Sequence, residues 1–252
     1  MSPRNEEILY FMMWTAEAFL RPSWRHMDES FEGWAWRTGL GPRLAQLERL
    51  KLVERVPEYL SPRLLRLTSE GHRLALGGRD PAVQWNRPWD GHWRMALFDI
   101  PASQPTLRRR FWRRLKNDHF GFLQNSVWIT PDPIDPSALV DAVGIKDVEA
   151  LLVVQGKPAA GEPDQVLVRS AWDFRAINSA YLACAAYLDT QPRKGELRDW
   201  AKEERRLWAA AMRLDPLLPR GLWPPGYLGP RIWQKRNDRI ASAAHAFGCQ
   251  AA

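Results

Sequence analysis

The chain has 252 residues, of which 45% are hydrophobic, so it is long enough for one large domain or two to three small ones. Its formal net charge of +7 favours a polyanionic partner, although many basic proteins bind no nucleic acid. Its two cysteines do not indicate a disulfide framework or a zinc site. No apolar run approaches the roughly 20 residues of a membrane span, and the first residues lack a signal-peptide pattern. We therefore expect a cytoplasmic protein that does not enter a membrane.

Residues 1–83 are the first predicted region, and they begin with helical patterns. Apolar periodicity predicts a helix over 6–19. A second helix fits 29–37, although this segment is rich in Trp and has a central glycine. Two glycines then break the pattern, and Pro42 suits the first turn of a third helix, over 42–52.

A short hairpin is predicted after the third helix. That helix has an apolar stripe of Leu44, Leu47 and Leu50. The β-prone runs 53–56 and 64–67 flank a turn with a proline at each side, and another short helix follows them. The order helix, helix, turn, helix, hairpin predicts a winged helix-turn-helix domain, whose third helix would lie in the major groove of DNA.

Four polar side chains of this region are candidates for DNA contacts. Gln46 and Arg49 project from the side of the third helix opposite the leucines, and both residue types can read bases through bidentate hydrogen bonds. Arg43, at the start of that helix, and Arg63, in the predicted wing, are better suited to phosphates. The alternative is that each is an ordinary solvated residue.

The second predicted region is residues 84–169. A segment typical of a linker, at 79–91, spans its beginning and is rich in Pro, Asp, Asn and Trp. Strand and helix patterns alternate here, ending in a short fifth strand. The predicted strands are 94–100, 122–124, 127–130, 150–155 and 165–168, and the predicted helices are 107–117 and 137–143. This order favours a ferredoxin-like fold.

The first helix of this region is unusually basic. Its buried face is predicted to contain Leu107, Phe111 and Leu115, which places Arg109 and Arg113 on the opposite side. An arginine face of this kind is often simply solvated. Otherwise these two arginines would contact either DNA beside the operator or the phosphates of a small CoA-type effector.

Residues 170–252, the third region, are predicted to be helical. Long amphipathic patterns cover 171–188 and 197–214, and a proline-rich joint separates the second from a last helix over 231–247. Cys184 is expected to be a small core residue. No Ser/His/Asp set, Cys/His set or phosphate-binding glycine loop is evident, so we expect no catalytic residues, no cofactor and no enzymatic activity. The three regions together predict an α+β protein.

Several segments resemble the PaaX family of transcriptional repressors. These are WDGHWRMALFDIP, LRRRFWRRLK and GFLQNSVWITP in the second region and LDPLLPRGLWPPGYLG in the third. The resemblance implies a winged helix, a Cas2-like middle domain and a helical C-terminal domain. It also implies a homodimer that represses a catabolic operon by binding double-stranded operator DNA and is released by an aryl-CoA thioester.

FDIP and LQNSVW also resemble the signature of Cas2 nucleases, which implies an alternative function as a metal-dependent nuclease or a nucleic-acid adaptor. In that family the acid at the end of the first strand, here Asp99, is thought to help hold a divalent metal between two protomers. No second acid lies close to Asp99 in the sequence. We therefore favour a structural Asp99 that caps the following turn, and expect no metal.

Overall fold

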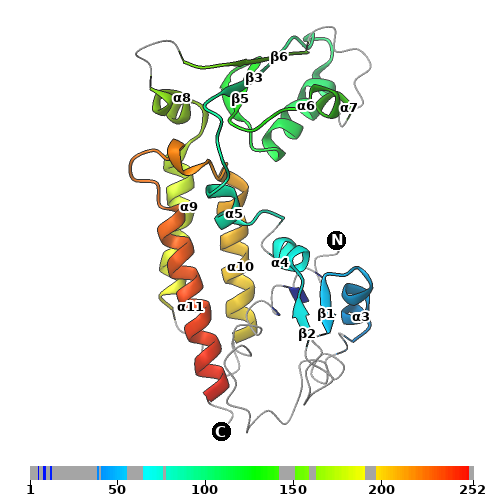
Figure 1. Cartoon of the computed structure of the whole chain (residues 1–252), viewed down its shortest axis with the longest axis vertical. Coiled ribbons are helices and arrows are strands. Elements are labelled where there is room, and N and C mark those ends of the chain that lie inside the picture. Colours follow the sequence, from blue (N-terminus) through cyan, green and yellow to red (C-terminus); the bar gives the residue numbers. More distant parts are fainter. Residues whose placement is uncertain are drawn as a thin grey trace. The chain divides into compact units, whose positions relative to one another are not determined.

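The structure, a computed structural model, describes residues 41–55, 65–75, 78–141, 151–158, 163–190 and 197–249, with positions 5, 8, 9, 12 and 39 (Figure 1). The chain forms two compact units, each assembled from separate stretches of sequence. Unit 1 contains 1–80, 182–209 and 230–252, and unit 2 contains 81–181 and 210–229. The predicted domains 1–83, 84–169 and 170–252 are continuous segments, and this division remains a prediction.

Unit 1 contains the predicted third helix and the hairpin. Helix α3 spans Gly41–Arg49, and strands β1 (Val53–Arg55) and β2 (Leu65–Leu67) pair antiparallel. Helix α4 follows at Ser69–Ala75. Of the predicted first helix, the three described positions, 8, 9 and 12, have helical backbone, as does position 5 just before it. The predicted helix 29–37 and the turn that contains Arg63 lie outside the described residues.

The predicted leucine stripe of α3 is shorter than expected. Leu44 and Leu47 are buried, but Leu50 is 54% exposed. The reason is local: α3 ends at Arg49, and Lys51 takes a left-handed conformation with φ of 55°, which redirects the chain. Leu52 then enters the core in place of Leu50. The Thr68 hydroxyl donates to the Lys51 carbonyl at 2.8 Å and so fixes this turn.

Residues from both ends of the chain build one hydrophobic core in unit 1. Leu44 and Leu47 of α3 belong to the same buried cluster as Leu188, Trp200 and Ile240, which come from three C-terminal helices. These helices are α9 (Phe174–Leu188), α10 (Leu197–Leu214) and α11 (Gly229–Cys249), as the helical patterns of the third region predicted. Cys184 is buried, as expected, and burial raises the pKa of its thiol to about 11.

A buried ion pair joins α10 to α11 inside unit 1. Arg236 Nε lies 2.7 Å from Glu204 Oε1, and both side chains are almost completely buried. The Arg236 guanidinium also lies over the Trp208 ring, 4.7 Å from its centroid, and over the Trp233 ring. Burial raises the pKa of Glu204, and the charge of Arg236 opposes that shift. Breaking such a pair leaves one buried charge uncompensated, so both residues fix how α10 meets α11.

Unit 2 contains a four-stranded antiparallel sheet whose strand order is β4-β5-β3-β6. Its elements follow the chain as β3 (Trp93–Phe98), α6 (Pro105–Asn117), β4 (Gly121–Gln124), β5 (Val127–Thr130), α7 (Pro136–Asp141) and β6 (Leu151–Gly156). This topology is ferredoxin-like, as predicted. Phe111 and Leu115 of α6 pack with Phe98 and Trp128 of the sheet and with Leu139 of α7.

Two sequence predictions for unit 2 are wrong. The expected strand 165–168 is part of helix α8 (Asp164–Ala171), whose buried residues Val168 and Ala171 are three positions apart, as on one helix face. The short apolar run VLV fits either structure, and the sheet already has four strands without it. The expected linker 79–91 contains a helix, α5 (Pro81–Trp85), whose Trp85 is buried.

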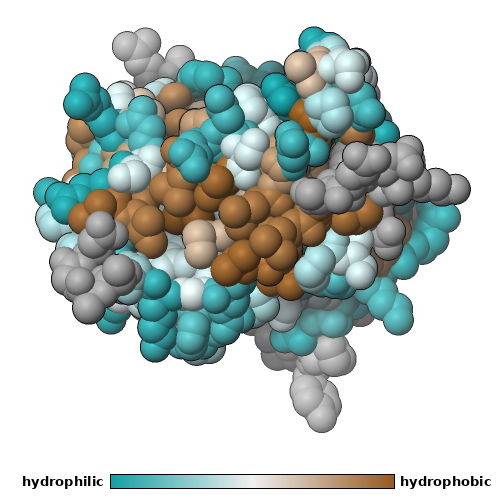
Figure 2. Space-filling view, turned by 90° about the horizontal axis from the view of Figure 1, so that it is seen from above, coloured by the Kyte–Doolittle hydropathy of each residue, from teal (hydrophilic) through white to brown (hydrophobic). Residues whose placement is uncertain are grey.

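The two faces of the sheet differ in how far they are covered. Cross-strand register places Met95, Leu97, Leu152 and Val154 on the face opposite α6 and α7. Leu152 is 58% exposed, whereas Met95, Leu97 and Val154 are half-buried. Figure 2 shows hydrophobic side chains gathered in a band on the face that it presents. The sheet therefore leaves part of an apolar face open to solvent.

Gly121 permits a close approach of α8 to the sheet. A Cβ at this position would lie 2.6 Å from the Ala171 Cβ and 2.7 Å from the Trp172 ring. Gly121→Ala should therefore lower the free energy of unfolding by about 1–3 kcal/mol through overpacking, measured by urea denaturation. Gly156→Ala is the matched control, because its Cβ would meet only Met95 Cε at 3.9 Å. Equal effects of both substitutions would contradict this account.

Candidate functional site

Helix α3 presents the predicted DNA-contacting side chains to solvent. Gln46 and Arg49 are exposed on the side opposite the buried Leu44 and Leu47, and Arg43 is half-buried near the start of the helix. The structure thus brings three of the four predicted residues onto one helix. Arg63, the fourth, lies outside the described residues.

Asn5 holds two of these side chains, and sequence reasoning missed it. Its own side chain is only 3% exposed. Asn5 Nδ2 donates to Gln46 Oε1 at 3.2 Å, and Arg43 Nη1 donates to Asn5 Oδ1 at 3.5 Å. Because Gln46 already accepts this hydrogen bond, the donors on its Nε2 are its more accessible groups toward a ligand. No local pattern could reveal a contact between residues that are 41 positions apart.

The hairpin beside α3 has its own charges largely neutralised. Arg55 Nε lies 2.7 Å from Glu48 Oε1, and Arg66 Nε lies 2.6 Å from Glu54 Oε1. Such exposed pairs add little stability, but each one offsets the charge of an arginine. Arg49, with no ion pair among the residues that the structure describes, therefore supplies exposed positive charge on this side of unit 1.

Helix α6 of unit 2 has the two faces that the sequence predicts. Phe111 and Leu115 are buried and Leu107 is half-buried, whereas Arg109 and Arg113 are exposed. Arg108 and Arg114 of α6 instead contact other residues of the unit, Ile100 and Asp118. Helix α6 is thus held by its apolar face and exposes its basic face.

Asp99 follows β3 and is exposed. Within the described ranges, no group of three or more His, Cys, Asp and Glu side chains is placed to hold a metal ion. The structural role expected for Asp99 and its role as a metal ligand both remain untested predictions. The same described residues include no helix that is long and apolar enough to cross a membrane.

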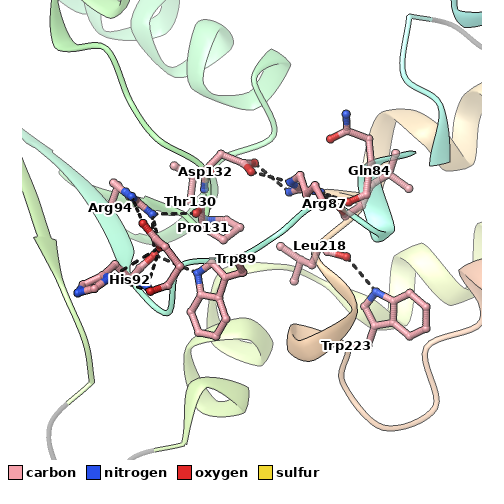
Figure 3. A network of polar contacts seen from close by, with 12 residues as sticks. Gln84, Arg87, Trp89, His92, Arg94, Thr130, Pro131, Asp132, Leu218 and Trp223 are labelled. Atoms are coloured by element: carbon pink, nitrogen blue, oxygen red, sulfur yellow. Dashed lines mark hydrogen bonds and ion pairs between the residues drawn. The ribbon is translucent and has the colours of Figure 1, made fainter. Parts of the chain in front are cut away.

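A polar network organises the segment that was expected to be a linker (Figure 3). Arg87 Nε and Nη2 lie 2.6 and 2.9 Å from the two carboxylate oxygens of Asp132, just after β5, in a bidentate pair. Arg87 Nη1 also donates to the backbone carbonyls of Gln84 and Leu217. One side chain therefore ties α5, the end of β5 and the proline-rich joint together.

The start of β3 has a second arginine network. Arg94 is 7% exposed, donates to both carboxylate oxygens of Asp90 and also donates to the Pro131 carbonyl at 3.1 Å. The hydrogen bond from Arg94 lowers the pKa of Asp90 to about 2. The WDGHWR segment is therefore a folded corner of unit 2, and its charged residues are engaged within the protein.

A buried carboxylate organises the proline-rich joint of unit 2. Asp215 accepts hydrogen bonds from the hydroxyls of Tyr181 and Tyr227 and from the backbone N–H of Leu217 at 2.7 Å. Trp85 Nε1 donates to the Tyr227 hydroxyl at 3.0 Å. Burial, together with the charge of Asp215, raises the pKa of both tyrosines, so they stay protonated and keep donating. These donors satisfy a carboxylate at the centre of an aromatic cluster.

Comparison with known proteins gives a family match and a solved structure of similar fold. Residues 86–168 match the model of the PaaX protein central Cas2-like domain. The uncharacterised protein Rv0674 from Mycobacterium tuberculosis has a similar fold, with a TM-score of 0.53 and 18% sequence identity. That similarity covers 94% of this chain and 96% of Rv0674. No curated protein matches the sequence.

The matched residues contain the whole four-stranded sheet with α6 and α7. They also contain Arg87 and Arg94, the centres of the two arginine networks. The α+β architecture and the ferredoxin-like topology of unit 2 agree with the match. Residues 86–168 are therefore similar to the PaaX protein central Cas2-like domain, which supports membership of the chain in the PaaX family.

Proposed function

We propose that the chain is a transcriptional repressor of the PaaX type, which binds double-stranded operator DNA through α3 and is released by an aryl-CoA or related effector. The observation that carries the proposal is the division of α3 into two faces. Leu44 and Leu47 anchor the helix in the core of unit 1, whereas Gln46 and Arg49 face solvent. The match to a family of regulators supports it.

In this proposal α3 is the recognition helix of a winged helix-turn-helix domain. The antiparallel strands β1 and β2 would be the stem of its wing. Arg49 suits the O6 and N7 acceptors of guanine, and the free amide donors of Gln46 suit base acceptors in the major groove. Arg43 and Arg63 would contact phosphates and hold the helix in register.

We also propose that the protein acts as a homodimer. The partly open apolar face of the sheet, with Met95, Leu97, Leu152 and Val154, fits an identical face of a second copy. A two-fold dimer would present two α3 helices to a palindromic operator. The effector is proposed from the family resemblance, since an aromatic acyl group suits an apolar pocket lined by aromatic side chains.

Arg49→Ala should weaken binding to the operator about 10- to 100-fold, because a lost bidentate base contact costs about 1–3 kcal/mol. Fluorescence anisotropy measures this with DNA from upstream of the chain's own gene, at fixed salt and with competitor DNA. Arg213→Ala removes another exposed arginine, on a different helix, and is the matched control. Equal losses in both variants would contradict the role of α3, and Mg²⁺-dependent cleavage that Asp99→Ala abolishes would support the nuclease alternative.

Asn5→Ala should weaken operator binding several-fold. The substitution removes the hydrogen bond that orients the Gln46 side chain, and such a bond contributes about 1 kcal/mol. Binding to unrelated DNA should change less, since Asn5 is uncharged and its hydrogen bond from Arg43 is long, at 3.5 Å. A double-mutant cycle with Gln46→Ala isolates this effect. If the losses from Asn5→Ala and Gln46→Ala simply add, Asn5 does not act through Gln46.

Phenylacetyl-CoA should bind the purified protein and lower its affinity for the operator. The 14 tryptophans make intrinsic fluorescence a suitable signal for a titration with this ligand, other acyl-CoA thioesters and the free acids. Operator release is then measured at a saturating concentration of each ligand that binds. The proposed effector class is wrong if no thioester changes either signal.

A further inference from the structure

Helix α6 accounts for nearly all of the positive excess of the chain. Its 13 residues include five arginines and one lysine and no acidic residue. Outside α6 the chain has 30 basic and 29 acidic residues, against a formal net charge of +7 for the whole chain. The charge that favours a polyanionic partner is therefore concentrated on one helix of unit 2.

Two of the six cations of α6 serve the fold. Arg108 Nη2 donates to the Ile100 carbonyl at 2.6 Å, and Arg114 forms an ion pair with Asp118. The other four are exposed, and none of their side chains has an ion pair or hydrogen bond with another described residue; they are Arg109, Arg110, Arg113 and Lys116. We call these four residues the α6 basic face.

Four exposed arginines elsewhere in the described chain are paired with glutamates, unlike the α6 basic face. Arg55, Arg66, Arg73 and Arg206 each lie within 2.7 Å of a glutamate oxygen. Pairing within the protein is thus common for an exposed arginine here. Four neighbouring cations without such pairing repel one another, and a bound polyanion would relieve this repulsion.

The backbone of α6 fixes the spacing of these charges. Phe111 and Leu115 anchor the helix on the sheet. Arg109, Arg113 and Lys116 stand at positions i, i+4 and i+7, so they form one row about 10 Å long. On a DNA strand, one phosphate recurs about every 3.4 Å of helix axis, so this row matches the length of about three phosphates. Guanidinium groups also fit phosphate oxygens in bidentate geometry.

We propose that the α6 basic face binds the phosphate backbone of double-stranded DNA without reading its sequence, as a second DNA-binding surface distinct from α3. The choice of DNA as the polyanion rests on the proposed function. A CoA-type ligand suits this surface less, because small ligands are held in concave sites that enclose most of their area. Here the four side chains stand exposed on the outer surface of a single helix.

The test compares the salt dependence of binding to a generic duplex without an operator sequence. Arg109→Gln with Arg113→Gln should reduce the slope of log K against log salt by about 1.8, since each lost phosphate contact removes about 0.9. Arg175→Gln with Arg213→Gln is the matched control, because it removes two exposed arginines from other helices and should leave the slope nearly unchanged. Circular dichroism and thermal melting check that both variants fold as the wild type does.

Three outcomes would overturn the proposal. The first is an unchanged slope in the α6 variant, and the second is a wild-type protein that does not bind the generic duplex even at low salt. The third is unchanged DNA binding with lost binding of CoA, which would assign the α6 basic face to a small ligand. A failure of the proposed function gives a different result. The chain would then bind its upstream DNA no more tightly than unrelated DNA, while the salt dependence of binding to the generic duplex would still test the α6 basic face.

Discussion

The burial of Leu44 and Leu47 is the constraint on which the candidate function depends. These side chains enter a core that includes Leu188, Trp200 and Ile240 from the C-terminal helices. Burying a leucine contributes about 1.5–3 kcal/mol to stability. A rotation of α3 about its axis would expose both leucines and lose this stabilisation. The outward direction of Gln46 and Arg49 is therefore set by packing on the inner side of the same helix. Asn5 adds a finer constraint, because it holds the end of one of these side chains.

Local patterns predicted most elements of the fold correctly. Periodicity located α3, α6, α9, α10 and α11, because each of these helices buries one face, and short apolar runs located the four strands of the sheet. The misplaced strand at 165–168 arose from a three-residue apolar run, which is too short to distinguish a strand from a turn of helix. The end of α3 depended on the left-handed Lys51, which no periodicity indicates.

The candidate site was predictable only in part, for a similar reason. Exposure of Gln46, Arg49, Arg109 and Arg113 follows from which helix face is apolar. Asn5 and Arg87 act across 41 and 130 positions of sequence, so their partners are known only once the chain is folded. The composition gives the net charge of the chain, but ion pairs within the folded protein decide which arginines remain available to a ligand. The segment at 79–91 looked like a linker because its polar residues bind distant partners instead of forming a periodic face.

The shared core of unit 1 has a consequence for how the protein is made. Ile240 and Leu44 belong to one hydrophobic cluster, although 195 other residues separate them along the chain. During synthesis α3 leaves the ribosome long before α11 exists, so its leucines cannot complete their native burial until α11 has been made. The sheet of unit 2 needs only residues up to β6 and can pair earlier. Formation of the unit 1 core is therefore expected to follow the pairing of the unit 2 sheet during synthesis.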